Sequence, residues 1–194
     1  MERNMYQIFG LVGPSGSGKT MLILEMVKRW PDKLAIIKSL TTRPSRGPED
    51  ELFYHFVTPE KFEQRRAEGH FLQSAEYAGN LYATDRGEVH KLLAEKYGIT
   101  ALVESSIKDF CAAGCRIILI KIKPINHQTR DGRAQADQRR AQTPLAFDAE
   151  VTNSFEPDGK ERAIKALSSI LENHFSSFDA ATRHTAPRPD DTSG

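Results

Sequence analysis

A run of small residues near the N-terminus has the composition of a loop that binds nucleotide phosphates. Residues 13–20 read Gly-Pro-Ser-Gly-Ser-Gly-Lys-Thr, which is the complete pattern G-x-x-x-x-G-K-T. In such a loop the backbone N–H groups turn toward phosphate oxygens, Lys19 reaches the β- and γ-phosphates, and the Thr20 hydroxyl ligates Mg²⁺. The pattern therefore predicts an ATP-binding loop made by Gly13, Ser15, Gly16, Ser17, Gly18, Lys19 and Thr20.

The segments on either side of this loop have the order that phosphate binding requires. Residues 6–12 are mostly apolar and of strand length, and residues 19–29 predict a helix that ends before Pro31. A helix that begins at the loop adds its N-terminal amides and its dipole to the anion site. The strand, loop and helix together favour a nucleotide site over an ordinary turn rich in glycine and serine.

A second group of residues could bind a phosphate monoester. Arg43 and Arg46 are three residues apart in a polar stretch with Thr, Ser and Pro. Guanidinium groups bind such dianions with two parallel hydrogen bonds, and the hydroxyls of Tyr54 and Tyr82 could add neutral donors. Each piece alone is typical of a solvated surface. After a phosphate loop, the set predicts a second anion site, for the molecule that accepts a phosphoryl group.

Strand and helix patterns alternate along the chain, which is typical of an α/β fold with a parallel sheet. A Thr cap followed by proline starts one helix at Thr58, and Asp85 with Glu88 predicts the start of another. The patterns predict strands at 34–38, 52–57, 71–73, 81–83, 99–104, 116–122 and 150–152, and helices at 58–69, 85–97, 105–114, 126–142 and 158–175. Residues 178–194 are polar without an apolar period and predict a disordered tail.

The composition excludes several functional classes. The chain has 194 residues, with 27 basic and 26 acidic side chains, for a net charge of +1. This balance argues against a general binder of nucleic acid or of membrane surfaces. No apolar run approaches the roughly 20 residues that span a bilayer, and the N-terminus leads directly into the first strand. We therefore expect a cytoplasmic protein, with Cys111 and Cys115 as reduced thiols.

Beyond these separate features, residues 6–175 resemble the guanylate kinase family. The resemblance rests on the phosphate loop and on four further motifs in order: Thr41-Thr42-Arg43-Pro44-Ser45-Arg46, Tyr54-His55-Phe56-Val57, Phe71-Leu72 with Ala75-Glu76-Tyr77, and Gly79-Asn80-x-Tyr82-x-Thr84. It implies a P-loop NTPase-type core of parallel sheet with helices on both faces (1–39 and 86–177). It further implies a nucleoside-monophosphate-binding insertion (40–85) and an Arg-bearing lid (126–142). Such enzymes transfer the γ-phosphoryl group of ATP to GMP or dGMP with Mg²⁺.

The resemblance also implies roles for individual residues. Arg43, Arg46, Tyr54 and Tyr82 fall on positions that hold the acceptor monophosphate, while Ser39 and Thr84 fall on positions that face guanine. Glu104 falls near an acidic position that organises Mg²⁺ and water. The lid candidates, which with Lys19 and Arg43 would stabilise the transferring group, are Arg130, Arg133, Arg139 and Arg140.

The sequence departs from the family where the base is read. Gln73 stands where the family has Glu, and Glu104-Ser105-Ser106 stands where it has Asp-x-Asp. A carboxylate only accepts hydrogen bonds and so matches the N1–H and N2–H₂ donors of guanine, whereas Gln73 and Ser106 both donate and accept. The loss of a charged acceptor reduces discrimination by about 1.5–3 kcal/mol. The departures leave two readings open: a loose guanylate kinase, or a kinase for another or a modified monophosphate.

Two further alternatives remain at this point. One is a kinase on the same scaffold whose acceptor is another nucleotide, a sugar phosphate or a DNA-borne hydroxyl, although the near-neutral charge argues against DNA. The other is a non-catalytic guanylate kinase-like binding module, although such modules have degraded ATP loops and this loop is complete. We expect ATP and a nucleoside monophosphate as ligands, Mg²⁺ as cofactor, and a monomer or homodimer.

Overall fold

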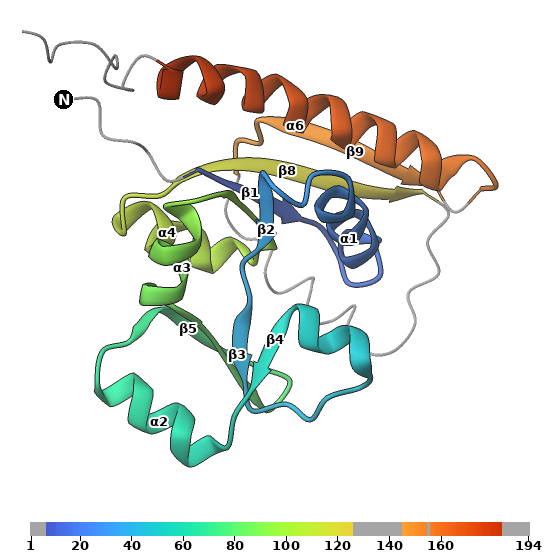
Figure 1. Cartoon of the computed structure of the whole chain (residues 1–194). Helices are drawn as coiled ribbons and strands as arrows, with labels where there is room; N and C mark the ends of the chain where they lie inside the picture. The colour runs from blue at the N-terminus through green and yellow to red at the C-terminus, as the bar shows by residue number, and fades with distance from the viewer. Residues whose placement is uncertain (1–6, 126–144, 155, 184–194) are drawn as a thin grey trace, which may run out of the picture.

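The computed structural model describes residues 7–125, 145–154 and 156–183, which form two sheets and their covering helices (Figure 1). The larger sheet has the strand order β2-β7-β1-β8-β9, and all its neighbouring strands are parallel. Its strands are β1 (Gln7–Val12), β2 (Leu34–Ile36), β7 (Tyr97–Ala101), β8 (Arg116–Ile125) and β9 (Ala149–Ser154). The predicted α/β class with a parallel core sheet is confirmed.

Helices cover both faces of the larger sheet because its strands carry apolar side chains on both sides. In β1, Phe9 and Leu11 pack in one apolar cluster with α1 and α6, whereas Ile8 and Val12 pack in another with α3 and α4. This alternation follows the two-residue period of a strand. The helices are α1 (Lys19–Arg29), α2 (Pro59–Ala67), α3 (Arg86–Leu93), α4 (Ile107–Ala112) and α6 (Gly159–Arg183).

The smaller sheet has the order β4-β3-β6-β5 and lies at the end of the molecule away from α6 (Figure 1). Its strands are β3 (Ser39–Thr41), β4 (Tyr54–Phe56), β5 (Phe71–Tyr77) and β6 (Asn80–Asp85). Helix α2 covers it, with Phe62 packed fully buried against Leu40 and Ala83. The chain enters this sheet directly after β2 and returns to the core at Asp85, where α3 begins.

The two predicted helix starts hold the smaller sheet in place. Thr58 Oγ1 accepts a hydrogen bond from the Lys61 N–H at 3.3 Å, so it caps α2 as expected. Asp85 Oδ1 accepts from the Glu88 N–H at 3.0 Å, and Asp85 Oδ2 is paired with Arg65 of α2 at 2.7 Å. Asp85 is almost fully buried, so this one carboxylate joins α2, β6 and α3.

Several predicted boundaries were wrong. The strand predicted at 34–38 ends at Ile36, because the chain leaves β7 there and starts a new strand at Ser39, which pairs with β6 and β4 in the smaller sheet. The strand 52–57 is shorter because Pro48–Leu52 form a 3-10 helix. The strands predicted at 71–73 and 81–83 are longer because they pair with each other as a hairpin.

Three further boundaries lie around the core sheet. Helix α3 ends at Leu93 rather than near Tyr97, because Tyr97 is already in β7 and buried in the core. The strand predicted at 99–104 ends at Ala101, and residues 104–106 form a 3-10 helix. Helix α6 continues to Arg183, so the predicted disorder of 178–183 was wrong; each added residue extends a helix by one backbone hydrogen bond.

Two other expectations can be compared with the described residues. Cys111 and Cys115 are both free thiols, as expected, and burial raises the pKa of the Cys115 thiol. None of the helices within 7–125, 145–154 and 156–183 has the length and apolar character needed to cross a bilayer. The predicted helix 126–142 and the tail from 184 lie outside the described residues.

Candidate active site

The predicted donor loop connects β1 to α1 at the carboxyl end of the central strand of the larger sheet. Lys19 folds back over this loop, and its Nζ donates to the carbonyls of Gly13 and Pro14, each at 2.7 Å, and to Ser17 Oγ at 3.3 Å. The ammonium is thus held at the loop itself. Gly16 and Gly18 both have positive φ, at 79° and 91°, which the curl of the loop requires.

The loop is also packed tightly against the sheet behind it. A side chain at Gly13 would meet the backbone carbonyl of Ile122 in β8, and one at Gly18 would meet the amide nitrogen of Asn153 in β9. Ser17 is fully buried. This packing holds the loop in one shape, which is the condition for binding phosphate without a large ordering cost.

Asn153 contacts the donor loop, and the sequence analysis did not predict this contact. Its Nδ2 donates to the Ser17 carbonyl at 2.9 Å, across 136 positions of the chain, and the side chain is 3% exposed. It lies at the edge strand β9, which packs under α6. No local pattern around Asn153 predicts this contact, because only the parallel sheet brings β9 to the loop.

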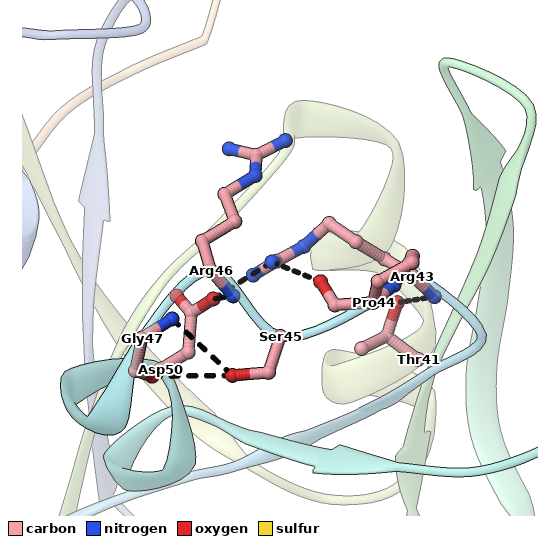
Figure 2. Close-up of polar contacts among 7 residues, drawn as sticks. All are labelled: Thr41, Arg43, Pro44, Ser45, Arg46, Gly47 and Asp50. Carbon is pink, nitrogen blue, oxygen red and sulfur yellow. Dashed lines mark hydrogen bonds and ion pairs between the residues drawn. The ribbon is translucent and has the colours of Figure 1, made fainter.

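The second predicted anion site is built around Arg43, which follows β3 in the smaller sheet (Figure 2). Arg43 Nη1 donates to Asp50 Oδ2 at 2.8 Å and to the Pro44 carbonyl at 2.9 Å, and the residue is only 6% exposed. The hydrogen bond with Asp50 raises the pKa of Arg43 and lowers the pKa of the Asp50 carboxyl. Arg43 is therefore a fully charged group in one fixed orientation.

Asp50 also ties Arg46 to this cluster. The Arg46 backbone N–H donates to the same Asp50 Oδ2 at 2.7 Å, while the Arg46 guanidinium extends away from the pair (Figure 2). The sequence analysis did not single out Asp50. A carboxylate four residues after Arg46, in the acidic run Glu49-Asp50-Glu51, was the available signal.

The predicted tyrosines surround the Arg43 guanidinium. Its central carbon lies 4.7 Å from the centre of the Tyr54 ring and 5.7 Å from that of Phe56, within the range of cation–π attraction. Tyr82 from β6 packs edge-on against Tyr54 at 6.2 Å between ring centres. Burial raises the pKa of the Tyr54 hydroxyl, so it remains a neutral donor. The structure thus brings together Arg43 from the loop after β3, Tyr54 from β4 and Tyr82 from β6.

The predicted base-reading residues lie on the same sheet. Gln73 of β5 is paired in register with Thr84 of β6, and Gln73 Nε2 donates to Thr84 Oγ1 at 3.0 Å. Thr84 is buried, and Ser39 is half-buried at the start of β3, paired with Tyr54. The residues predicted to bind the acceptor phosphate and those predicted to face its base therefore lie on neighbouring strands of the smaller sheet.

Ser106, predicted to contact the acceptor base, lies in the 3-10 turn that follows β7. It is 2% exposed, and its Oγ donates to the carbonyl of Val103 at 2.7 Å. Its side chain forms no cap on α4, although it stands at the start of that helix. The hydroxyl proton is therefore already used within the 3-10 turn that follows β7.

Comparisons with known proteins agree with this arrangement. A family model described as guanylate kinase matches residues 6–174. The chain is 30% identical over 187 residues to a guanylate kinase of Schizosaccharomyces pombe, covering 81% of this chain and 86% of that protein. It is 28% identical over 179 residues to a guanylate kinase of Synechocystis, covering 83% and 93%. The chain belongs to the guanylate kinase family.

The fold agrees with this assignment. A crystal structure of guanylate kinase from Anaplasma phagocytophilum superposes with a TM-score of 0.57 at 18% identity, over 89% of this chain and 87% of that one. As a member of the guanylate kinase family, the chain is an ATP-dependent phosphotransferase of the nucleotide kinase class, on a P-loop scaffold.

Guanylate kinases use Mg²⁺ with ATP, and the residues present fit a bound cation. Glu104 Oε2 is buried and has no hydrogen-bond partner among the described residues. A buried carboxylate oxygen of this kind is normally satisfied by a cation or by water. Thr20 is exposed at the first turn of α1. Within the described part of the chain, no three His, Cys, Asp or Glu side chains cluster as ligands. This suits Mg²⁺, which binds through few protein ligands together with substrate phosphates and water.

The lid candidates cannot be placed beside these groups. Arg130, Arg133, Arg139 and Arg140 all lie in 126–144, outside the described residues. The structure therefore assembles two of the predicted groups separately, the donor loop at the larger sheet and the group around Arg43 at the smaller sheet.

Proposed function

We propose that this chain transfers the γ-phosphoryl group of ATP to GMP or dGMP. The observation that carries the proposal is the Arg43 guanidinium, buried and fixed beside Tyr54 and Tyr82, in a chain that also has an intact donor loop. The donor loop by itself would account only for ATP binding. A monophosphate acceptor needs a second phosphate site, and a dedicated arginine such as Arg43 provides one.

The chemistry that these residues perform is positioning and charge neutralisation. The hydrogen bonds of Arg43 to Asp50 and to the Pro44 carbonyl both use Nη1, so Nε and Nη2 are the donors that would bind the acceptor phosphate. The Tyr54 and Tyr82 hydroxyls add neutral donors, and Arg46 adds a second cation. A monophosphate oxygen is already a nucleophile, so the transfer needs no general base.

On the donor side, the loop amides and Lys19 hold the β- and γ-phosphates of ATP. Lys19 would move from the carbonyls of Gly13 and Pro14 to the phosphates, since both positions lie at the same loop. Thr20 and Glu104 would hold Mg²⁺, Glu104 through water. Bound there, Mg²⁺ neutralises the charge that gathers on the β- and γ-phosphate oxygens during transfer.

The hydrogen bonding of Gln73 is compatible with guanine as the base. Gln73 Nε2 gives one of its two N–H groups to Thr84, and the amide oxygen can accept from the substrate. An amide oxygen accepts hydrogen bonds, as the carboxylate of the family does, and the N1–H and N2–H₂ groups of guanine are donors. The amide lacks the charge of a carboxylate, so we expect guanine to be preferred by a narrower margin than with Glu.

The test is a coupled assay of ADP release with Mg·ATP and a panel of acceptors: GMP, dGMP, AMP, dAMP, UMP, dUMP, dTMP and CMP. We expect GMP or dGMP to give the highest kcat/KM, with AMP as the nearest competitor. A clear preference for another nucleotide would overturn the assignment of the base. ATP binding without turnover of any acceptor would instead favour a non-catalytic module.

Three further expectations belong to this proposal. A cytoplasmic location agrees with its substrates, ATP and a nucleoside monophosphate. The arginines of 126–142 would close over the transferring group as a lid. The choice between monomer and homodimer stays a prediction that sedimentation at micromolar concentration would decide.

A further inference from the structure

Asn153 contacts the donor loop at a single peptide group. Its Nδ2 donates to the Ser17 carbonyl at 2.9 Å, and both residues are buried. This carbonyl stands one residue ahead of the first carbonyl that α1 uses, since the helix begins its bonding with Leu22 N–H to Gly18 O. The Ser17 carbonyl therefore lies where a helix would not satisfy it, and Asn153 does so instead.

The direction of one carbonyl decides the direction of the next N–H. The structure has no cis peptide bond among its described residues, so the peptide between Ser17 and Gly18 is trans and planar. In a trans peptide the C=O and N–H bonds point in opposite directions. With its carbonyl held by Asn153 from the buried side, this peptide must point its Gly18 N–H away from the protein interior, to the open side of the loop.

We propose that Asn153 is a positioning residue of the donor site, which holds the Ser17 carbonyl and thereby turns the Gly18 N–H toward the phosphates of ATP. The proposal rests on the proposed function of the loop as the donor site. A loop peptide that flipped would present a carbonyl oxygen to the phosphates, which repel it. Asn153 removes that alternative.

The close packing at Gly18 agrees with this role. Any side chain at Gly18 would collide with Asn153 Nδ2, and the φ of 91° already disfavours one. The direction of the hydrogen bond between Asn153 and Ser17 is also fixed. A carbonyl only accepts, so residue 153 must donate, and an aspartate of the same shape would present an acceptor to an acceptor.

The test compares Asn153→Ala and Asn153→Asp with the wild type. Inorganic tripolyphosphate is the first probe, because it reports on the loop without base or acceptor, and the KM for Mg·ATP is the second. We expect Asn153→Ala to weaken both by about three- to tenfold, the size of one neutral hydrogen bond. Asn153→Asp should weaken both by about ten- to a hundredfold, since its charge faces a carbonyl and lies near phosphates. The KM for GMP should change by less than about twofold.

Ser154→Ala is the matched control. Ser154 is the next residue of β9, is similarly buried, and its Oγ accepts from the Glu156 N–H without contact to the loop. Its removal should leave tripolyphosphate binding unchanged. Both substitutions at this buried position cost stability, so affinities are compared at a temperature at which the melting curve of each variant shows it to be folded.

Two outcomes would overturn the proposal: unchanged tripolyphosphate affinity in both variants, or equal losses for the acceptor and for ATP. A lower melting temperature with unchanged affinity would show a purely structural asparagine. The proposed function fails differently, because wild-type protein would then bind tripolyphosphate and Mg·ATP but turn over no monophosphate. Tripolyphosphate binding tests Asn153 in either case.

Discussion

The two phosphate sites of this chain are built in different ways. The donor loop is a contiguous eight-residue segment whose binding groups are mainly backbone amides, fixed by glycine geometry and by packing against β8 and β9. The acceptor group uses side chains from the loop after β3, from β4 and from β6, with Arg43 fixed by Asp50 and by aromatic rings.

The difference concerns what holds each positive charge in place. Lys19 is held by groups of its own loop, namely the Gly13 and Pro14 carbonyls and the Ser17 hydroxyl. Arg43 is held by a carboxylate seven residues away and by a ring from the neighbouring strand, so its position depends on the smaller sheet being folded. Substitutions in the two sites should therefore affect different kinetic constants.

The largest effect is expected at Lys19. Lys19→Ala removes the one cation that the loop aims at the β- and γ-phosphates, so kcat/KM should fall by about 10²–10³-fold. The coupled assay with GMP measures this loss. Lys28→Ala, an exposed lysine of the same helix, is the control and should behave as the wild type. Retained turnover in Lys19→Ala would refute the donor assignment.

The next effect is expected at Arg43. Arg43→Lys keeps the charge but loses the planar fork that bonds Asp50 and stacks on Tyr54, so the KM for GMP should rise by about ten- to a hundredfold. The KM for Mg·ATP should stay within about twofold of wild type, since the donor loop is a separate site. Arg29→Ala, an exposed arginine on α1, is the control. Equal rises in both constants would mean that the sites are not separate.

A smaller effect is expected from restoring a charged base reader. Gln73→Glu places a carboxylate beside the guanine donors, so the ratio of kcat/KM for GMP over AMP should increase by about tenfold. Ser74→Ala, whose exposed side chain points to the other face of β5, should leave the ratio unchanged. An unchanged ratio in Gln73→Glu would place base discrimination elsewhere in the site.

The smallest effect concerns the Arg43–Asp50 pair and its pH dependence. The pKa of Asp50 is lowered in the folded protein by its hydrogen bond to Arg43, so ionised Asp50 stabilises the fold above the ordinary carboxyl pKa. This stabilisation is lost as the pH falls through the lowered pKa of Asp50.

Thermal unfolding of the wild type and of Asp50→Asn between pH 7 and pH 3 measures this contribution. The wild type should melt at the higher temperature near neutral pH, and the two curves should converge at the acid end. At neutral pH, Asp50→Asn should raise the KM for GMP by about two- to fivefold, because the amide holds Arg43 by a weaker bond. A constant difference in melting temperature across this pH range would mean that the ion pair contributes nothing.

The sequence alone predicted the donor loop and its flanking elements, because the glycines, Lys19 and the apolar strand before them are consecutive and act through local backbone geometry. It predicted the caps at Thr58 and Asp85 for the same reason, since a side chain bonding an N–H three residues on is a local event. The family resemblance added the residues of the smaller sheet.

The tertiary structure decided the contacts between distant residues. Asn153 meets Ser17 only because β8 and β9 extend the parallel sheet beyond β1, and no pattern around either residue records that neighbour. The inward turn of Ser106 and the end of α3 at Leu93 depend on burial beside β7, which overrides local helix preference. Hydrogen bonds between residues a few positions apart can be predicted from a short stretch of sequence. The partner of a buried polar group depends instead on the order of the strands in the whole sheet.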